Sequence, residues 1–93
     1  MSLRKGFATA LQFARKQKGL TQEDFSDVSS RTYLSSLERA MKSPTLDKVE
    51  QLSDVMGIHP ATLVMMAAMK AERKNLDQLV AQISREINGL NHP

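Results

Sequence analysis

Apolar residues recur every three or four positions through most of the chain, which is the spacing of one buried face of an α-helix. In the N-terminal segment this pattern predicts a helix over 2–18, and Gly19 is placed to end it in the left-handed conformation. The apolar face of this helix consists of Leu3, Phe7, Leu11 and Ala14.

Two more amphipathic segments lie in the middle of the chain. Thr45 can cap a helix over 46–56 that Gly57 ends, and Pro60 suits the first position of the helix after it. The predicted buried stripe of the first helix consists of Leu46, Val49, Leu52 and Met56, and the apolar residues of the second are Leu63, Val64 and Ala67.

The C-terminal segment carries a further apolar stripe. Residues 60–88 contain no internal Gly or Pro, so one long helix is an alternative, but Asn75 with Gln78 three residues later predicts a new helix from Leu76. The stripe consists of Leu76, Leu79, Val80, Ile83, Ile87 and Leu90. Five shorter helices within 1–71 supply a core without this stripe, so it either folds back on them or pairs with a second chain. We expect 72–93 to be a dimerisation segment.

The stretch 21–39 has the make-up of a helix-turn-helix. Thr21 can cap a short helix with Asp24 three residues later, and Ser30 can cap a second helix. In the second helix Leu34 and Leu37 face inward. The opposite face carries a guanidinium and small hydroxyls, which suits a helix that reads DNA, from Arg31, Thr32, Ser35 and Arg39.

Charge is distributed unevenly. The chain has 13 Lys and Arg against 10 Asp and Glu, for a net charge of +3. Residues 1–45 hold eight basic and four acidic side chains, a net of +4, whereas the remainder holds five and six, a net of −1. A basic half is typical of a module that binds a polyanion. Taken alone, this asymmetry would be better explained by an ordinary solvated surface.

Residue usage argues against several other functions. The chain has no Cys, which excludes disulfides and thiolate metal sites and is compatible with a reducing cytoplasm. Its two histidines, His59 and His92, lie far apart, so we expect no metal site, and no motif indicates a cofactor or an enzyme. We also expect no membrane association, because no apolar run is long enough to span a bilayer.

From residue 7 to about residue 64 the chain resembles the Cro/phage-repressor helix-turn-helix family, often called the XRE family. The matching pieces include Gly19-Leu20-Thr21-Gln22-Glu23-Asp24-Phe25, Arg31-Thr32-Tyr33-Leu34-Ser35 and Ser43-Pro44-Thr45-Leu46. The resemblance implies an all-α fold, a five-helix phage-repressor-like DNA-binding bundle, here followed by a C-terminal amphipathic helix. Between Phe25 and Arg31 the family usually has about two more residues, so we expect the helix before this turn to be shortened or tightened.

The resemblance also implies roles for individual residues. It places five residues against bases in the major groove: Ser30, Arg31, Thr32, Ser35 and Ser36. It places five others near phosphates: Gln22, Tyr33, Arg39, Lys42 and Thr45. Arg15 and Glu38 are implied to form a structural ion pair between the first helix and the recognition helix. For Tyr33, packing at the edge of the core is the expected primary role.

Two functions therefore compete. The first is a sequence-specific double-stranded DNA-binding transcriptional regulator, a repressor, acting as a homodimer on a near-palindromic operator. The alternative is an antitoxin-like protein-interaction module whose C-terminal segment binds a partner protein and whose DNA binding is autoregulatory. A regular apolar stripe over 76–90 favours self-association over the charged, disordered tail that is typical of partner-binding segments.

Overall fold

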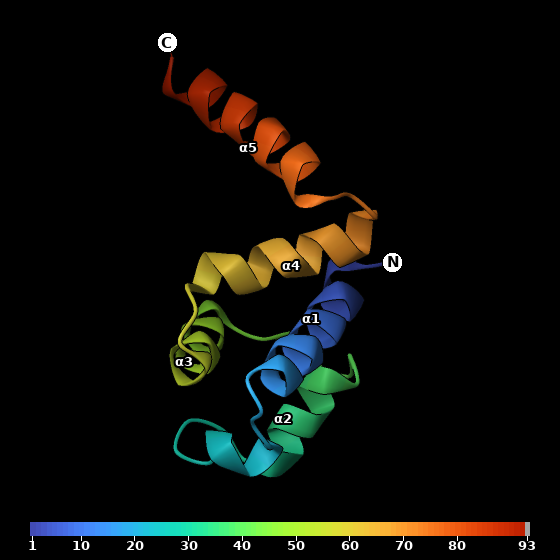
Figure 1. Cartoon of the computed structure of the whole chain (residues 1–93), viewed down its shortest axis with the longest axis vertical. Coiled ribbons are helices and arrows are strands. Elements are labelled where there is room, and N and C mark those ends of the chain that lie inside the picture. Colours follow the sequence, from blue (N-terminus) through green and yellow to red (C-terminus); the bar gives the residue numbers. More distant parts are fainter. Residues whose placement is uncertain (93) are drawn as a thin grey trace.

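Six helical segments follow one another in the computed structural model, which describes residues 1–92 (Figure 1). They are α1 (Leu3–Gln17), the short 3₁₀ helix η1 (Gln22–Phe25), α2 (Arg31–Glu38), α3 (Leu46–Met56), α4 (Pro60–Glu72) and α5 (Leu76–Asn91). The described part of the chain contains no strand, so the prediction of an all-α fold is confirmed.

Capping residues set the helix boundaries much as the sequence indicated. The side chains of Ser2, Ser30 and Thr45 accept hydrogen bonds from backbone N–H groups in the first turns of α1, α2 and α3. At Asn75 the bonds are reciprocal, because its Oδ1 accepts from Gln78 N at 2.8 Å and its own N–H donates to Gln78 Oε1 at 2.9 Å. The break between α4 and α5 is therefore real, and the alternative of one long helix is wrong.

The segment before the recognition helix is tightened, as its shortness predicted. It forms only the four-residue 3₁₀ helix η1, and the Asp24 carboxylate accepts a 2.7 Å hydrogen bond from Thr21 N. Val28 lies beyond this helix and is half-buried against the core. After α2, Ala40 turns the chain with φ of 59°, a left-handed conformation that glycine adopts more easily.

The core lies between α1, η1, α2, α3 and α4. Its fully buried large side chains include Leu11, Phe25, Leu34, Leu37, Leu52 and Leu63. α1 and α4 approach closely at Gly6, where an added Cβ would lie 2.3 Å from the carbonyl oxygen of Ala67. The prediction that Leu46 is buried is wrong: it is 85% exposed, because it opens α3 at the edge of the bundle.

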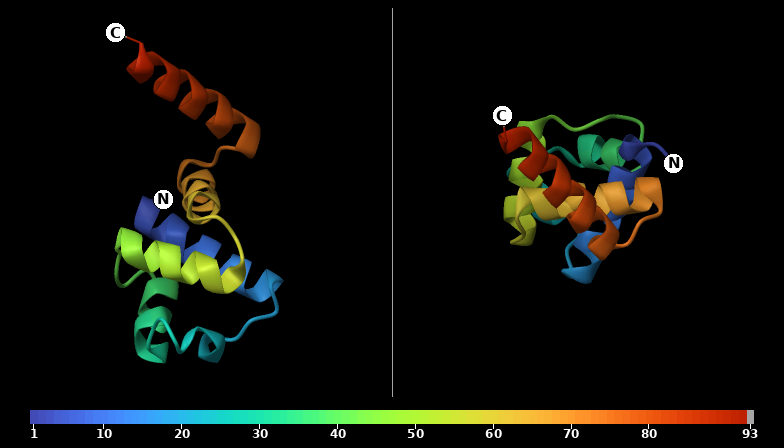
Figure 2. Two further views of the ribbon diagram at one scale, coloured as in Figure 1. Left: turned by 90° about the vertical axis from the view of Figure 1, so that its left-hand side faces the viewer. Right: turned by 90° about the horizontal axis from the view of Figure 1, so that it is seen from above.

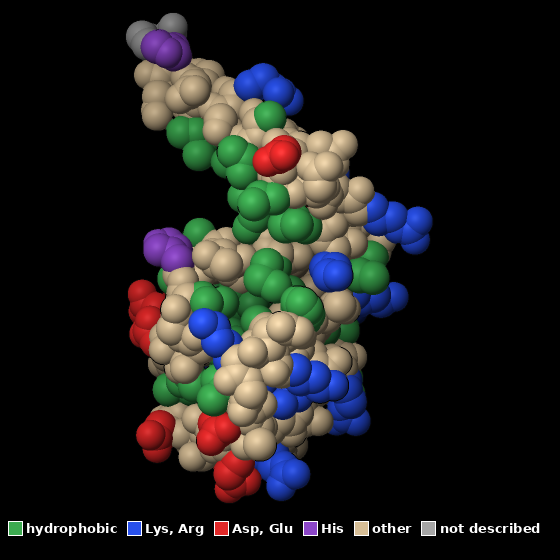
Figure 3. Space-filling view, viewed as in Figure 1, with side chains coloured by type: hydrophobic (Ala, Val, Ile, Leu, Met, Phe, Trp, Pro, Cys, Tyr) green, Lys and Arg blue, Asp and Glu red, His purple; other side chains and the backbone are tan. Residues whose placement is uncertain are grey.

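α5 extends away from this bundle and gives the molecule extents of 46 × 23 × 22 Å (Figures 1 and 2). Leu79, 2% exposed, and a 2.8 Å hydrogen bond from Lys74 Nζ to Gln82 Oε1 fix its first turns. Further along, a notch lined by hydrophobic side chains separates α5 from α4 (Figure 3). Placing Leu79 at a dimer interface is therefore wrong, because its own chain already buries it.

Within residues 1–92 no single helix is long and apolar enough to cross a membrane. Only α3 and α4 taken together reach that length and apolar character, and the chain bends by 105° between them.

Candidate nucleic-acid interface

α2 presents one apolar and one polar face, as its sequence predicted. Leu34 and Leu37 are fully buried, and the side chains on the other face surround a shallow polar hollow of about 380 Å³. This polar hollow is lined by Gln22, Arg31, Thr32, Ser35 and Arg39. Five of the ten residues assigned to DNA thus lie around one surface feature, although they come from two helical segments.

The two arginines of the polar hollow are not neutralised by nearby acids. The ion pairs within residues 1–92 are Arg15–Glu38 and Lys74–Glu72, so neither Arg31 nor Arg39 takes part in one. Arg39 is partly oriented by a long hydrogen bond of 3.4 Å from its Nε to the Ser35 carbonyl oxygen. A free guanidinium can donate two parallel hydrogen bonds to a guanine edge or a phosphate.

Two of the predicted base-contacting serines have structural roles. Ser36 is only 8% exposed and donates its hydroxyl to the Thr32 carbonyl oxygen at 3.1 Å, so assigning it to the DNA-facing surface is wrong. Ser30 remains exposed, but its Oγ caps α2 by accepting a 3.1 Å hydrogen bond from Tyr33 N. Neither serine lines the polar hollow.

A second basic group surrounds Tyr33. The phenol ring packs against the core, and the ammonium groups of Lys42 and Lys48 lie 5.5 and 5.7 Å from its centroid. Lys48 also donates a hydrogen bond to the Val28 carbonyl oxygen, which ties α3 to the turn before α2. Thr45 is exposed and caps α3. Sequence reasoning missed Lys48, because only the fold brings it to the Tyr33 ring.

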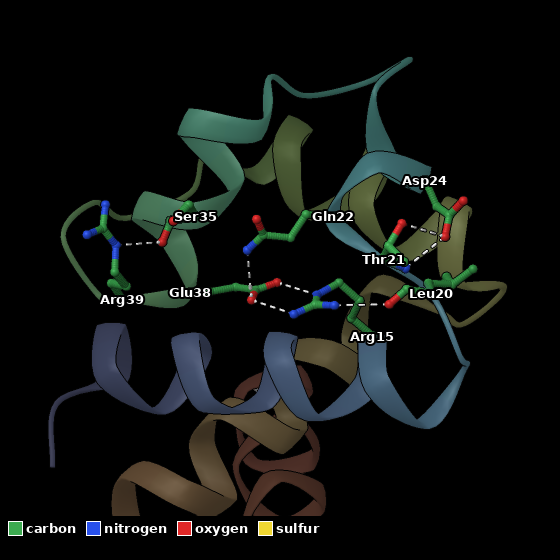
Figure 4. A network of polar contacts seen from close by, with 8 residues as sticks. All are labelled: Arg15, Leu20, Thr21, Gln22, Asp24, Ser35, Glu38 and Arg39. Carbon is green, nitrogen blue, oxygen red and sulfur yellow. Dashed lines mark hydrogen bonds and ion pairs between the residues drawn. The ribbon is translucent and has the colours of Figure 1, made fainter.

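The predicted ion pair between Arg15 and Glu38 is present and connects α1 to the end of α2 (Figure 4). Arg15 Nε and Nη2 donate to the two carboxylate oxygens at 2.7 and 2.9 Å, and Nη1 donates to the Leu20 carbonyl oxygen at 3.0 Å. The hydrogen bond to Glu38 raises the pKa of Arg15 despite the opposing effect of burial. Gln22 Nε2 joins the same carboxylate at 3.3 Å, so this pair also positions one wall of the polar hollow.

Other site chemistries find little support in the described residues. Within residues 1–92 no group of three or more His, Cys, Asp or Glu side chains is placed to hold a metal ion. His59 caps α4, with its Nδ1 accepting a hydrogen bond from Ala61 N at 2.9 Å. What the site offers is an exposed helix with hydrogen-bond donors and unpaired cations.

Comparison with known proteins gives the same picture. Residues 11–63 match the family model described as "Helix-turn-helix". A protein of Sinorhizobium fredii (strain NBRC 101917 / NGR234), the uncharacterized HTH-type transcriptional regulator y4dJ, is 38% identical over 66 residues, which cover 69% of this chain and 86% of that protein. No solved structure gave a significant match. The chain belongs to the XRE-type helix-turn-helix family of DNA-binding transcriptional regulators.

Proposed function

We propose that this protein is a repressor that binds a specific, near-palindromic operator in double-stranded DNA as a homodimer in the cytoplasm. The observation that carries the proposal is the polar hollow on α2, where Arg31 and Arg39 are exposed and free of acidic partners. A recognition helix with its N-terminal residues exposed is suited to enter the major groove.

Within this proposal the residues divide between base reading and backbone binding. Arg31, at the first position of α2, reads a guanine, and Thr32 and Ser35 approach neighbouring base edges. Phosphates are bound by residues at the rim and around the Tyr33 ring: Gln22, Tyr33, Arg39, Lys42 and Thr45. Lys48 joins this set because of its place beside Tyr33.

The homodimer rests on the exposed apolar side chains of α5. Leu76, Val80, Ile87 and Leu90 are between 45% and 85% exposed, which is a large apolar surface for a helix that extends into solvent. Two recognition helices joined through α5 would bind half-sites about one helical turn apart, roughly 34–36 Å. The same face is the surface on which the antitoxin-like alternative would bind a partner protein.

Binding to duplex DNA should depend steeply on salt. Each phosphate neutralised by Lys or Arg releases counterions, so a plot of log affinity against log salt should have a slope of about −0.9 per phosphate. Fluorescence anisotropy with a random duplex at several salt concentrations measures the slope. A flat response would contradict DNA binding as the function.

Replacing Arg31 with alanine should relax sequence specificity. We expect a loss of about 1–3 kcal/mol on the cognate site, with discrimination at one base position largely abolished. Sites selected from random duplexes provide the cognate sequence, and affinities for it and for its single-base variants provide the test. Arg39→Ala should weaken cognate and random DNA alike, and Arg85→Ala, on α5, is the matched control that should leave both unchanged. Equal losses on both DNAs from Arg31→Ala would instead identify Arg31 as a phosphate contact.

A further inference from the structure

The notch between α4 and α5 is an apolar groove that the chain itself leaves open. It has a volume of about 560 Å³, and hydrophobic side chains gather along it (Figure 3). Its walls include Val49 of α3, Ala61, Val64, Met65 and Ala68 of α4, and Ile83 of α5. A dry cavity of about 150 Å³ can already hold a benzene ring, so the notch has room for several aliphatic side chains.

The apolar surface continues from the notch onto the N-terminal part of the molecule. Leu46, Val49 and Val64 also line an adjoining hollow of about 290 Å³ that reaches Leu3 and Phe7 of α1. Leu46 is 85% exposed and Leu3 56% exposed, although both are large aliphatic residues. Among the described residues, none from α5 lines this adjoining hollow.

The end of α5 carries exposed apolar side chains of the kind that this groove could accommodate. Ile87 and Leu90 are 52% and 85% exposed, and they lie on the last turns of a helix that leans away from α4. Residues 1–92 therefore carry an apolar ridge, formed by Ile87 and Leu90, and an apolar groove, and no other described part of the chain covers the ridge or fills the groove. In a two-fold dimer each surface meets its counterpart on the other copy, which is the self-complementarity that such an interface requires.

We propose that the end of α5 from a second copy of this chain occupies the notch, in a reciprocal exchange between two protomers. This proposal deepens, and rests on, the homodimer proposed above by naming the seat: Ile87 and Leu90 of one protomer pack against Val64, Met65 and Ala68 of the other. Direct pairing of one α5 with another would leave the notch open.

The size of the contact agrees with a specific dimer. Residues 80–90, which carry the last four side chains of the apolar stripe, form about 16 Å of helix about 10 Å wide, so half of that surface is roughly 250 Å². Each protomer contributes one such helix and one groove, which brings the total area buried to roughly 1,000 Å², where specific interfaces begin. Both of the equivalent contacts are needed to reach this area. A substitution that disrupts either the end of α5 or the notch should therefore separate the protomers.

Complementation between two variants tests the exchange. In sedimentation equilibrium without DNA, the full chain should be a dimer. Ile87→Glu and Val64→Lys should each raise its dissociation constant by about 100-fold, since a tenfold loss at each of two equivalent seats multiplies. An equimolar mixture of the two should associate at least about tenfold more tightly than either alone, because the mixed dimer has one native seat and one Lys–Glu seat.

The control variant is Ala81→Glu, on the outward side of α5, which adds the same charge as Ile87→Glu and should dimerise like the wild type. Circular dichroism checks that every variant is folded, and Ala68→Lys replaces Val64→Lys if Val64→Lys unfolds.

A different result would overturn the exchange. If Ile87→Glu breaks the dimer but Val64→Lys leaves it intact, and mixing the two restores nothing, the protomers pair directly through α5 and α5. A monomeric wild type would also overturn the exchange and would favour another protein as the occupant of the notch. Binding of a half-site duplex, measured in parallel, should survive both variants; if the wild type binds no duplex, the proposed repressor fails independently of the dimer result.

Discussion

Replacing Glu38 with alanine is expected to lower the free energy of unfolding by about 3–5 kcal/mol, as found when one partner of a buried ion pair is removed. The side chains of Arg15 and Glu38 are 11% and 3% exposed, so the guanidinium left behind could not regain its water shell. Both carboxylate oxygens accept hydrogen bonds from Arg15, and Gln22 adds a third. Urea denaturation followed by circular dichroism measures the change.

The chain offers a matched control for this loss. Lys74 and Glu72 also form an ion pair, at 3.4 Å, but their side chains are 38% and 44% exposed. Glu72→Ala should therefore cost no more than about 1 kcal/mol, as expected for a pair that water screens. A loss from Glu38→Ala as small as that from Glu72→Ala would show that the buried pair contributes little.

A double-mutant cycle separates the pair from its surroundings. If the penalty of Glu38→Ala comes from the uncompensated Arg15 charge, Arg15→Ala with Glu38→Ala should be less destabilising than the sum of the single changes. Additive effects would place the energy in other contacts, such as the 3.0 Å hydrogen bond from Arg15 to the Leu20 carbonyl oxygen. Because Glu38 also holds Gln22, the single variant should weaken DNA binding even under conditions where it stays folded.

The helix boundaries could be predicted from the sequence because they depend on neighbours three or four residues apart. Ser30 caps α2 through Tyr33 N, and Asn75 caps α5 through Gln78, so a local reading sufficed for both. The tightening of η1 was likewise foreseeable, since too few residues separate Phe25 from Arg31 for a full helix and a turn. The Arg15–Glu38 pair spans 23 positions, and only the family resemblance pointed to it.

Sequence-based predictions are wrong where the environment of a residue depends on residues distant in the sequence, or where the residue lies at the end of a helix. Leu46 continues the apolar period of α3, but it stands at the first helical position, beyond the bundle. The family resemblance implies that Ser36 contacts a base, yet its hydroxyl donates a hydrogen bond to the Thr32 carbonyl oxygen one turn earlier and its side chain is buried. Lys48 reaches Tyr33 and the Val28 carbonyl oxygen only because α3 packs beside that turn.

The C-terminal stripe shows the same limit on a larger scale. Its period predicted an amphipathic α5 correctly, but periodicity does not say which surface covers an apolar face. Leu79 is buried within its own chain, Ile83 lines the notch, and Leu90 is exposed, so one stripe meets three environments. The direction in which α5 leaves α4 decides among them, and the turn at Arg73, with φ of 54°, sets that direction.

Gly6 is the position where local propensity and tertiary packing disagree most, and it gives the second large prediction. Alanine is favoured over glycine inside a helix by about 1 kcal/mol, so by propensity Gly6→Ala should stabilise α1. An added Cβ would, however, lie 2.3 Å from the Ala67 carbonyl oxygen and 3.1 Å from the Ala71 backbone nitrogen. These are backbone atoms of α4, which cannot rotate away as the end of a side chain could.

We therefore expect Gly6→Ala to destabilise the protein by about 3 kcal/mol, in the upper part of the range for overpacked cores, as α1 is pushed off α4. Gly89→Ala is the matched control, because Gly89 lies in α5 with nothing within 4 Å of the added Cβ, and it should be neutral or slightly stabilising. Urea denaturation of both variants measures the difference. If Gly6→Ala were as stable as Gly89→Ala, the close approach of α1 to α4 at Gly6 would not be needed for stability.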